Sequence, residues 1–118
     1  MIAGEYALTI ERGAHFGPRQ FTFRRTVTGL GIDMSAYTLL APYSRSYGGA
    51  RVGVIGTSWV DASTGVGQLE DPASITAAIP EAIAGRGYVW NLLAVRISDG
   101  EIFGPYLRGT LTISGVVL

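Results

Sequence analysis

The clearest hydrophobic pattern in this chain lies in residues 87–114, which read GYVWNLLAVRISDGEIFGPYLRGTLTIS. Two apolar runs flank residues 98–100, and an Asp-Gly pair between apolar runs is a strong hairpin signal. The pattern predicts a strand over 87–97, a turn, and a return strand that ends at residue 113. Both runs carry apolar residues at odd and at even positions, whereas a sheet with one hydrated face needs them at one parity only. Something is therefore expected to cover a second face of this hairpin.

Strict alternation of apolar and polar residues marks two further strands near the N-terminus. In residues 5–11 and again in residues 20–27, the large apolar side chains share one parity. A period of two predicts half-buried strands. The side chains expected in the core from these two strands are Tyr6, Leu8, Ile10, Phe21 and Phe23.

The middle of the chain is interrupted more often by glycine and proline. Residues 37–43 predict a strand in which Pro42 requires an edge position or a bend, because proline cannot donate to a ladder. Residues 51–60 predict a strand interrupted at Gly53 and Gly56, and residues 61–67 predict a loop.

One helix is predicted, over residues 72–79. Asp71 is placed to cap it, Pro72 fits the first helical position, and Pro80 limits it. A short strand over residues 74–78 is the alternative. With about seven strands and turn signals between them, the fold class expected is all-β, an antiparallel β-sandwich of immunoglobulin-like size. A chain of 118 residues fits a single domain spanning 1–118.

Composition suggests a surface that is less hydrated than usual. Charged residues make up 15% of the chain, compared with about 25% in typical domains. All nine basic residues are arginine, which suits interfaces better than lysine. Codon bias in a GC-rich genome is the alternative explanation for the arginines. Burial against partner proteins is expected from the first observation.

The chain shows no pattern that predicts catalysis, a cofactor or a metal site. The absence of cysteine excludes disulfides, thiolate zinc sites and a cysteine nucleophile. His15 is the only histidine, and only a cleft that places it beside two carboxylates would favour an enzyme. The formal charge is zero and no basic stripe is present, so nucleic-acid binding is not expected.

Two further expectations concern ligands and location. A carbohydrate-binding module is an alternative function, with a possible aromatic platform of Trp59, Tyr43 and Tyr47. No signal peptide is recognised, and no apolar run approaches the roughly 20 residues that a membrane helix needs. Synthesis in the cytoplasm is therefore expected, with no contact to a membrane.

Several short motifs follow one another in an order that resembles a known family. They are YALTIERG at residues 6–13, FTF at 21–23, IDMSAYT at 32–38, YVWNL at 88–92, DG at 99–100 and GTLTI at 109–113. In this order they resemble small virion proteins of tailed phages that carry an immunoglobulin-like domain. Such domains are found at the N-terminus of baseplate upper proteins and also as separate short chains.

The resemblance implies a non-enzymatic structural role in a bacteriophage virion, after synthesis in the host cytoplasm. The expected role is an adaptor in the tail, neck or fibre-attachment region that docks to other virion proteins. It is expected to form a homo-oligomer, with a trimer favoured. A capsid decoration protein that cements capsomers is a close alternative.

The resemblance also divides the terminal hairpin into two faces. The inward side chains that it implies are Trp90, Leu92, Leu111 and Ile113. The other side then forms a candidate interface, which consists of Val89, Leu93, Val95, Ile97 and Arg96. Either a neighbouring subunit or the chain's own helix or loop is expected to cover this second face.

Overall fold

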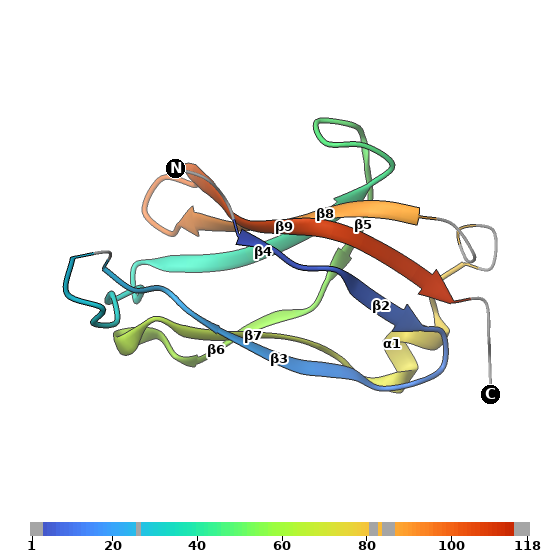
Figure 1. Cartoon of the computed structure of the whole chain (residues 1–118), viewed down its shortest axis with the longest axis horizontal. Helices are drawn as coiled ribbons and strands as arrows, with labels where there is room; N and C mark the ends of the chain where they lie inside the picture. The colour runs from blue at the N-terminus through green and yellow to red at the C-terminus, as the bar shows by residue number, and fades with distance from the viewer. Residues whose placement is uncertain (1–3, 26, 81–82, 84–86, 115–118) are drawn as a thin grey trace.

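Two β-sheets packed face to face make up the fold (Figure 1). The computed structural model describes residues 4–25, 27–80, 83 and 87–114. The sandwich is elongated, with extents of 43 × 26 × 26 Å. The all-β sandwich predicted from the alternating patterns is confirmed.

The larger sheet contains six strands in the order β1-β9-β8-β4-β5, with β2 also paired to β9. The strands β1 and β2 run parallel to β9, and the other neighbours are antiparallel. Their bounds are β1 (Gly4–Glu5), β2 (Leu8–Glu11), β4 (Tyr37–Ser44), β5 (Arg51–Ile55), β8 (Gly87–Arg96) and β9 (Ile102–Ser114).

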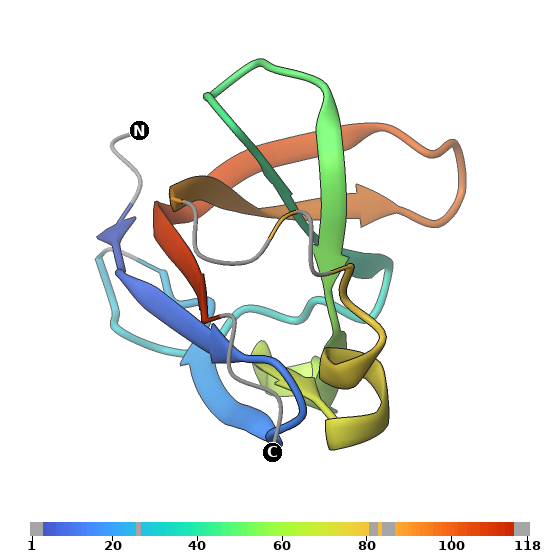
Figure 2. The same cartoon turned by 90° about the vertical axis from the view of Figure 1, so that its right-hand side faces the viewer.

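The smaller sheet has three antiparallel strands in the order β3-β7-β6. Its bounds are β3 (Phe16–Thr22), β6 (Thr57–Asp61) and β7 (Val66–Asp71). A 3-10 turn η1 (Ala62–Thr64) joins β6 to β7, and the helix α1 (Ala73–Ala77) follows β7. Viewed end-on, α1 closes one end of the sandwich (Figure 2), where the Thr76 hydroxyl donates to the Ala14 carbonyl at 2.7 Å.

The core lies between the two sheets and confirms most of the predicted inward side chains. Seven of them are at most 8% exposed: Leu8, Ile10, Phe23, Trp90, Leu92, Leu111 and Ile113. Phe21 is half-buried and packs against this cluster. The inner face of β8 and β9 is therefore the one that the resemblance implied.

Tyr6 was predicted in the core but is 59% exposed. The edge strand is interrupted between β1 and β2, and the backbone of Tyr6 serves as the link at this point. Its N–H donates to the Arg108 carbonyl at 2.8 Å, and its carbonyl accepts from the Trp90 indole at 2.9 Å. A side chain at Gly109 would collide with the Tyr6 carbonyl, so glycine permits this close approach.

The strand predicted over 51–60 is two strands that belong to different sheets. The chain crosses from the larger to the smaller sheet at Gly56, between β5 and β6. The central strand of the smaller sheet, β7, was not predicted from the sequence. Part of it lies in residues 61–67, which were predicted as a loop. Every second residue of β7 is buried, and one of these inward positions is Gly67, where the ring of Phe21 fills the space of a side chain. The strand therefore lacks a regular apolar pattern in the sequence.

Of the edge position or bend predicted for Pro42, the edge position is not found, because β4 lies between β8 and β5. On β8, Leu40 pairs with Leu93 and Tyr43 pairs with Trp90, whereas Ala41 and Pro42 between them form no ladder pair with β8. The missing N–H of Pro42 therefore lies at an interruption in that ladder.

The predicted helix is confirmed as α1, but its predicted cap is not. Pro72 occupies the capping position without a side-chain hydrogen bond. The Asp71 carboxylate instead accepts from the Gly56 N–H at 3.1 Å and holds the crossing between the sheets. Asp71 is 7% exposed, and burial raises the pKa of its carboxyl above the usual value.

Substitutions of Asp71 separate the hydrogen bond from the charge. Asp71→Ala is expected to lower the free energy of unfolding by about 1–3 kcal/mol, because the Gly56 N–H loses its acceptor. Asp71→Asn keeps an acceptor and removes the buried charge. Its free energy of unfolding is therefore expected to equal or exceed that of the parent at about pH 7. Urea unfolding followed by tryptophan fluorescence measures both.

The difference in stability between the parent and Asp71→Asn is expected to depend on pH. A carboxyl whose folded pKa is raised binds its proton more readily in the folded chain, so acidification through that pKa stabilises the parent relative to Asp71→Asn. Any advantage of Asp71→Asn is therefore expected to shrink between about pH 7 and about pH 4. Equal destabilisation by Asn and Ala would contradict this account of the carboxylate.

Candidate functional site

The larger sheet presents a mainly apolar outer face, on the side away from the smaller sheet. We call it the outer face, and its apolar residues are Leu40, Pro42, Val52, Val54, Val89, Leu93, Val95 and Ile102. Val54 is 44% exposed and Ile102 is 58% exposed. The residues of β4 and β8 in this set are half-buried by their neighbours.

Strand register joins these residues into one surface. Leu40 lies opposite Leu93 across the β4–β8 ladder. Pro42 lies opposite Val54 on β5, and Val95 lies opposite Ile102 on β9. Cross-strand neighbours at such positions touch on the sheet surface. The outer face is therefore a continuous apolar band across four strands.

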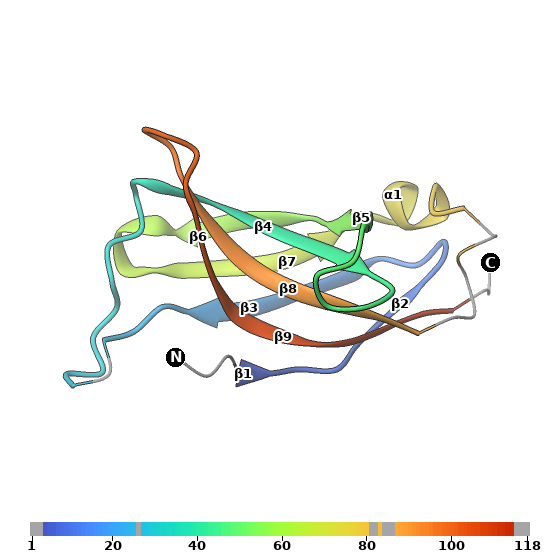
Figure 3. The same ribbon diagram turned by 90° about the horizontal axis from the view of Figure 1, so that it is seen from above.

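Only the loop of residues 45–50 lies over the outer face among the segments that the structure describes (Figures 1 and 3). The Tyr47 hydroxyl donates to the Gly109 carbonyl at 3.2 Å, and the Arg108 guanidinium lies 5.2 Å from the Tyr47 ring centre. The loop thus covers one end of the face. The helix predicted as a possible cover packs at the end of the sandwich instead.

Four of the five predicted interface residues lie on the outward side of β8 or just beyond its end. Val89, Leu93 and Val95 alternate with the buried residues of β8 and are half-buried. Ile97 lies just beyond the strand and is 64% exposed. That a partner covers these side chains stays a prediction.

Arg96 does not belong to this surface. Its guanidinium donates to Asp99 at 3.1 Å and to Glu101, and lies 5.0 Å from the Phe103 ring centre. The hydrogen bond with Asp99 raises the pKa of Arg96 and lowers the pKa of the Asp99 carboxyl. Arg96 therefore stabilises the β8–β9 turn and is already paired within the chain.

The outer face also carries polar residues, of which Asn91 and Arg108 lie opposite each other on β8 and β9. The Asn91 Oδ1 and the Arg108 Nε have no hydrogen-bond partner among the described residues. The Glu5 carboxylate lies 4.0 Å from the Arg108 Nε, which is an ion-pair distance but too long for a hydrogen bond. These unsatisfied groups lie at the end of the face that Tyr47 covers.

His15 forms one ion pair and no larger constellation. Its Nε2 lies 2.7 Å from the Glu70 carboxylate, and Gln68 donates to the same carboxylate at 3.3 Å. The His15 side chain is 53% exposed. Glu11 lines the same shallow cavity of about 300 Å³, but no contact joins it to His15. Among the described residues, the hydrogen-bond partner of the imidazole is the Glu70 carboxylate, and Thr9 also lines the cavity.

The aromatic platform proposed for carbohydrate binding is not formed. Tyr43 is only 5% exposed and packs against Tyr88. Trp59 lies on the smaller sheet, packs against Phe23 and donates its indole N–H to the Tyr37 carbonyl at 3.0 Å. Tyr47 lies over the opposite sheet. The three rings therefore do not share a surface.

The described residues show no metal-binding group, and the comparisons identify no family for the chain. Within the described part of the chain, no group of three or more His, Cys, Asp or Glu residues could hold a metal ion. No described helix is both long and apolar enough to span a bilayer. No protein-family model matches the chain, and no curated protein sequence matches it either.

Alanine substitutions at Leu92 and Leu93 test the assignment of the two faces. Leu92 is fully buried, so Leu92→Ala is expected to cost about 2–5 kcal/mol at every protein concentration. Leu93→Ala is expected to cost about 1 kcal/mol or less in the dissociated chain. Any larger loss should appear only where the chain associates, and should fall on dilution. A large, concentration-independent loss at Leu93 would show that this side chain is part of the chain's own core.

Proposed function

We propose that this chain is a non-enzymatic structural protein that assembles with copies of itself through the outer face of its larger sheet. The observation that carries the proposal is the uncovered apolar band formed by β5, β4, β8 and β9. Large exposed apolar patches are unusual on monomeric proteins and mark interaction surfaces. Sheet faces of this kind are buried when a second sheet packs about 10 Å away.

The charge distribution supports burial rather than hydration of this face. The set of outward residues on the four strands includes arginine and asparagine but no carboxylate among the described positions 38–44, 51–55, 89–95 and 102–110. The arginines lie at the end near the 45–50 loop. Interfaces have such a composition, since arginine is enriched in them and acidic residues are depleted.

The biological setting that we propose is the virion of a tailed phage, with the chain as an adaptor in the tail, neck or fibre-attachment region. This part rests on the motif resemblance, and the sandwich fold is compatible with it. Repeated copies in a virion follow closed symmetry, so a homo-oligomer, with a trimer favoured, is consistent with such a role.

A capsid decoration protein is the second candidate, because it would use an apolar face in the same way. Copy number separates the two roles. Quantitative mass spectrometry of purified particles should find the adaptor at a small multiple of the tail symmetry. Abundance comparable to that of the major capsid protein would favour decoration, and absence from the particles would contradict both.

Matched aspartate variants test assembly through the outer face. Val54→Asp and Leu93→Asp place a charge in the face, so the dissociation constant is expected to rise about tenfold or more. Val60→Asp is the control, because Val60 lies on the smaller sheet and is 50% exposed, close to the 44% of Val54. Light scattering over a dilution series measures the masses.

The parent and the Val60→Asp variant are both expected to have a mass that is a multiple of the 12.5 kDa chain. A parent mass of one chain at every concentration would contradict self-assembly. Equal dissociation of the Val54 and Val60 variants would contradict the choice of face.

A further inference from the structure

Three cavities follow one another along the strand β3, on the open side of the sandwich. Their volumes are about 480, 300 and 270 Å³. Each includes residues of β3 or of its immediate continuation, so together they accompany the strand from Phe16 to Arg24. We call this depression the edge groove. Its opposite wall comes from Tyr6–Ala7, β2 and β9 of the larger sheet.

The strand β3 is an edge of the smaller sheet. It pairs with β7, and its other side pairs with no strand in the part of the chain that the structure describes. Residues Arg19–Thr22 keep a continuous register with β7, so this stretch is regular enough to accept another strand. A free edge presents a row of backbone N–H and carbonyl groups.

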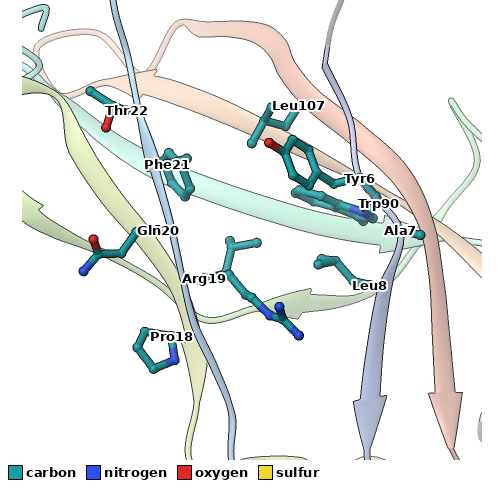
Figure 4. Close-up of a pocket in the computed structure, with 11 residues that line it drawn as sticks. Tyr6, Ala7, Leu8, Pro18, Arg19, Gln20, Phe21, Thr22, Trp90 and Leu107 are labelled. Carbon is teal, nitrogen blue, oxygen red and sulfur yellow. Dashed lines mark hydrogen bonds between the residues drawn. The ribbon is translucent and has the colours of Figure 1, made fainter.

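The central cavity has an apolar floor. Leu8, Leu69 and Trp90 are each at most 8% exposed and lie at its base. Figure 4 shows Phe21 and Arg19 on the groove side of β3, whereas Gln20 points away from it. The side chains of an added strand would alternate in the same way, with every second one entering the groove.

Arg19 gives the groove its charge. Its side chain points across the opening toward Leu8 (Figure 4), and no described carboxylate lies within ion-pair distance of it. The central cavity contains no acidic residue, Arg24 lines the cavity at one end of the groove, and Glu11 lines the cavity at the other. The groove is therefore apolar at its floor and positive at its centre.

We propose that the edge groove binds an extended segment of a partner protein, which adds to β3 as a further strand. Backbone hydrogen bonds to β3 would hold the segment, apolar side chains would enter the groove, and a carboxylate on the same face would pair with Arg19. The proposal goes beyond assembly through the outer face and does not depend on it, since the groove lies between the edges of the two sheets and shares no lining residue with the outer face.

The same residues would keep the free edge from pairing indiscriminately. Pro18 has no N–H to offer, and an inward-pointing charge such as Arg19 disfavours neutral strands. A partner carboxylate removes that penalty, because the guanidinium then has a counter-charge. Arg19 thus acts as a specificity residue that admits acidic, alternating strands.

Two synthetic peptides test this proposal with the full chain. The probe is acetyl-Thr-Val-Thr-Glu-Thr-Val-Thr-amide, whose central Glu and two Val share one face in either strand direction. The matched peptide carries Gln in place of Glu. Amide chemical shifts of the ¹⁵N-labelled protein are followed during titration to millimolar peptide.

The Glu peptide is expected to shift the amides of β3 and the Trp90 indole, and to bind about fivefold more tightly than the Gln peptide. In Arg19→Gln this preference should disappear. Arg45→Gln removes an arginine from the 45–50 loop, far from the groove, and should leave the preference unchanged.

Three outcomes would overturn the proposal. The first is an absence of shifts along β3 with either peptide. The second is equal shifts along β6, the other edge of the smaller sheet, which would show unselective edge pairing. The third is a Glu preference that survives in Arg19→Gln, which would place the carboxylate elsewhere.

Discussion

A two-layer sandwich can bury only one face of each sheet, and this constraint governs the whole molecule. In β8 the inward positions are filled by Trp90 and Leu92, which the smaller sheet covers completely. The same strand carries Leu93 and Val95 on the other face, and Val54 on β5 and Ile102 on β9 extend that face as exposed side chains. Since apolar surface is removed from water at a gain of about 25 cal/mol per Å², a further layer is the physical expectation. The outer face is the consequence of a larger sheet with two apolar sides.

The hydrogen bond from the Trp90 indole to the Tyr6 carbonyl sets the second feature of the molecule. It holds the interruption between β1 and β2 against β9 and leaves the side chain of Tyr6 outside the core. The edge of the larger sheet therefore ends opposite β3 without pairing with it. The space between these two edges is the edge groove, where Arg19 stands as a charge at an otherwise apolar opening.

Much of the larger sheet could be predicted from the sequence, because residues 5–11 alternate and two apolar runs flank a strong Asp-Gly turn. The centre of the smaller sheet could not, since β7 has Gly67 at an inward position and relies on Phe21 from another strand to fill that space, so residues 61–67 were predicted as a loop. The crossing at Gly56 was predicted only as an interruption, by a bulge or a bend, within one strand, because the residue that holds it is the distant Asp71. Parity identified Val89, Leu93 and Val95 as outward, but it could not show that Arg96 is paired with Asp99 and Glu101. The edge groove arises from strands that are distant in sequence, so no local pattern could predict it.

Solvent access at the methyl groups of the outer face tests the central claim most directly. A neutral gadolinium chelate relaxes the NMR signals of methyl groups that water can reach. Leu92, which is fully buried, and Val27, which is 96% exposed, are internal references for protected and accessible methyls. The account predicts that the methyls of Leu93 and Val54 are protected like Leu92 at high protein concentration and become accessible on dilution. Accessibility like that of Val27 at every concentration would contradict a role for this face in assembly.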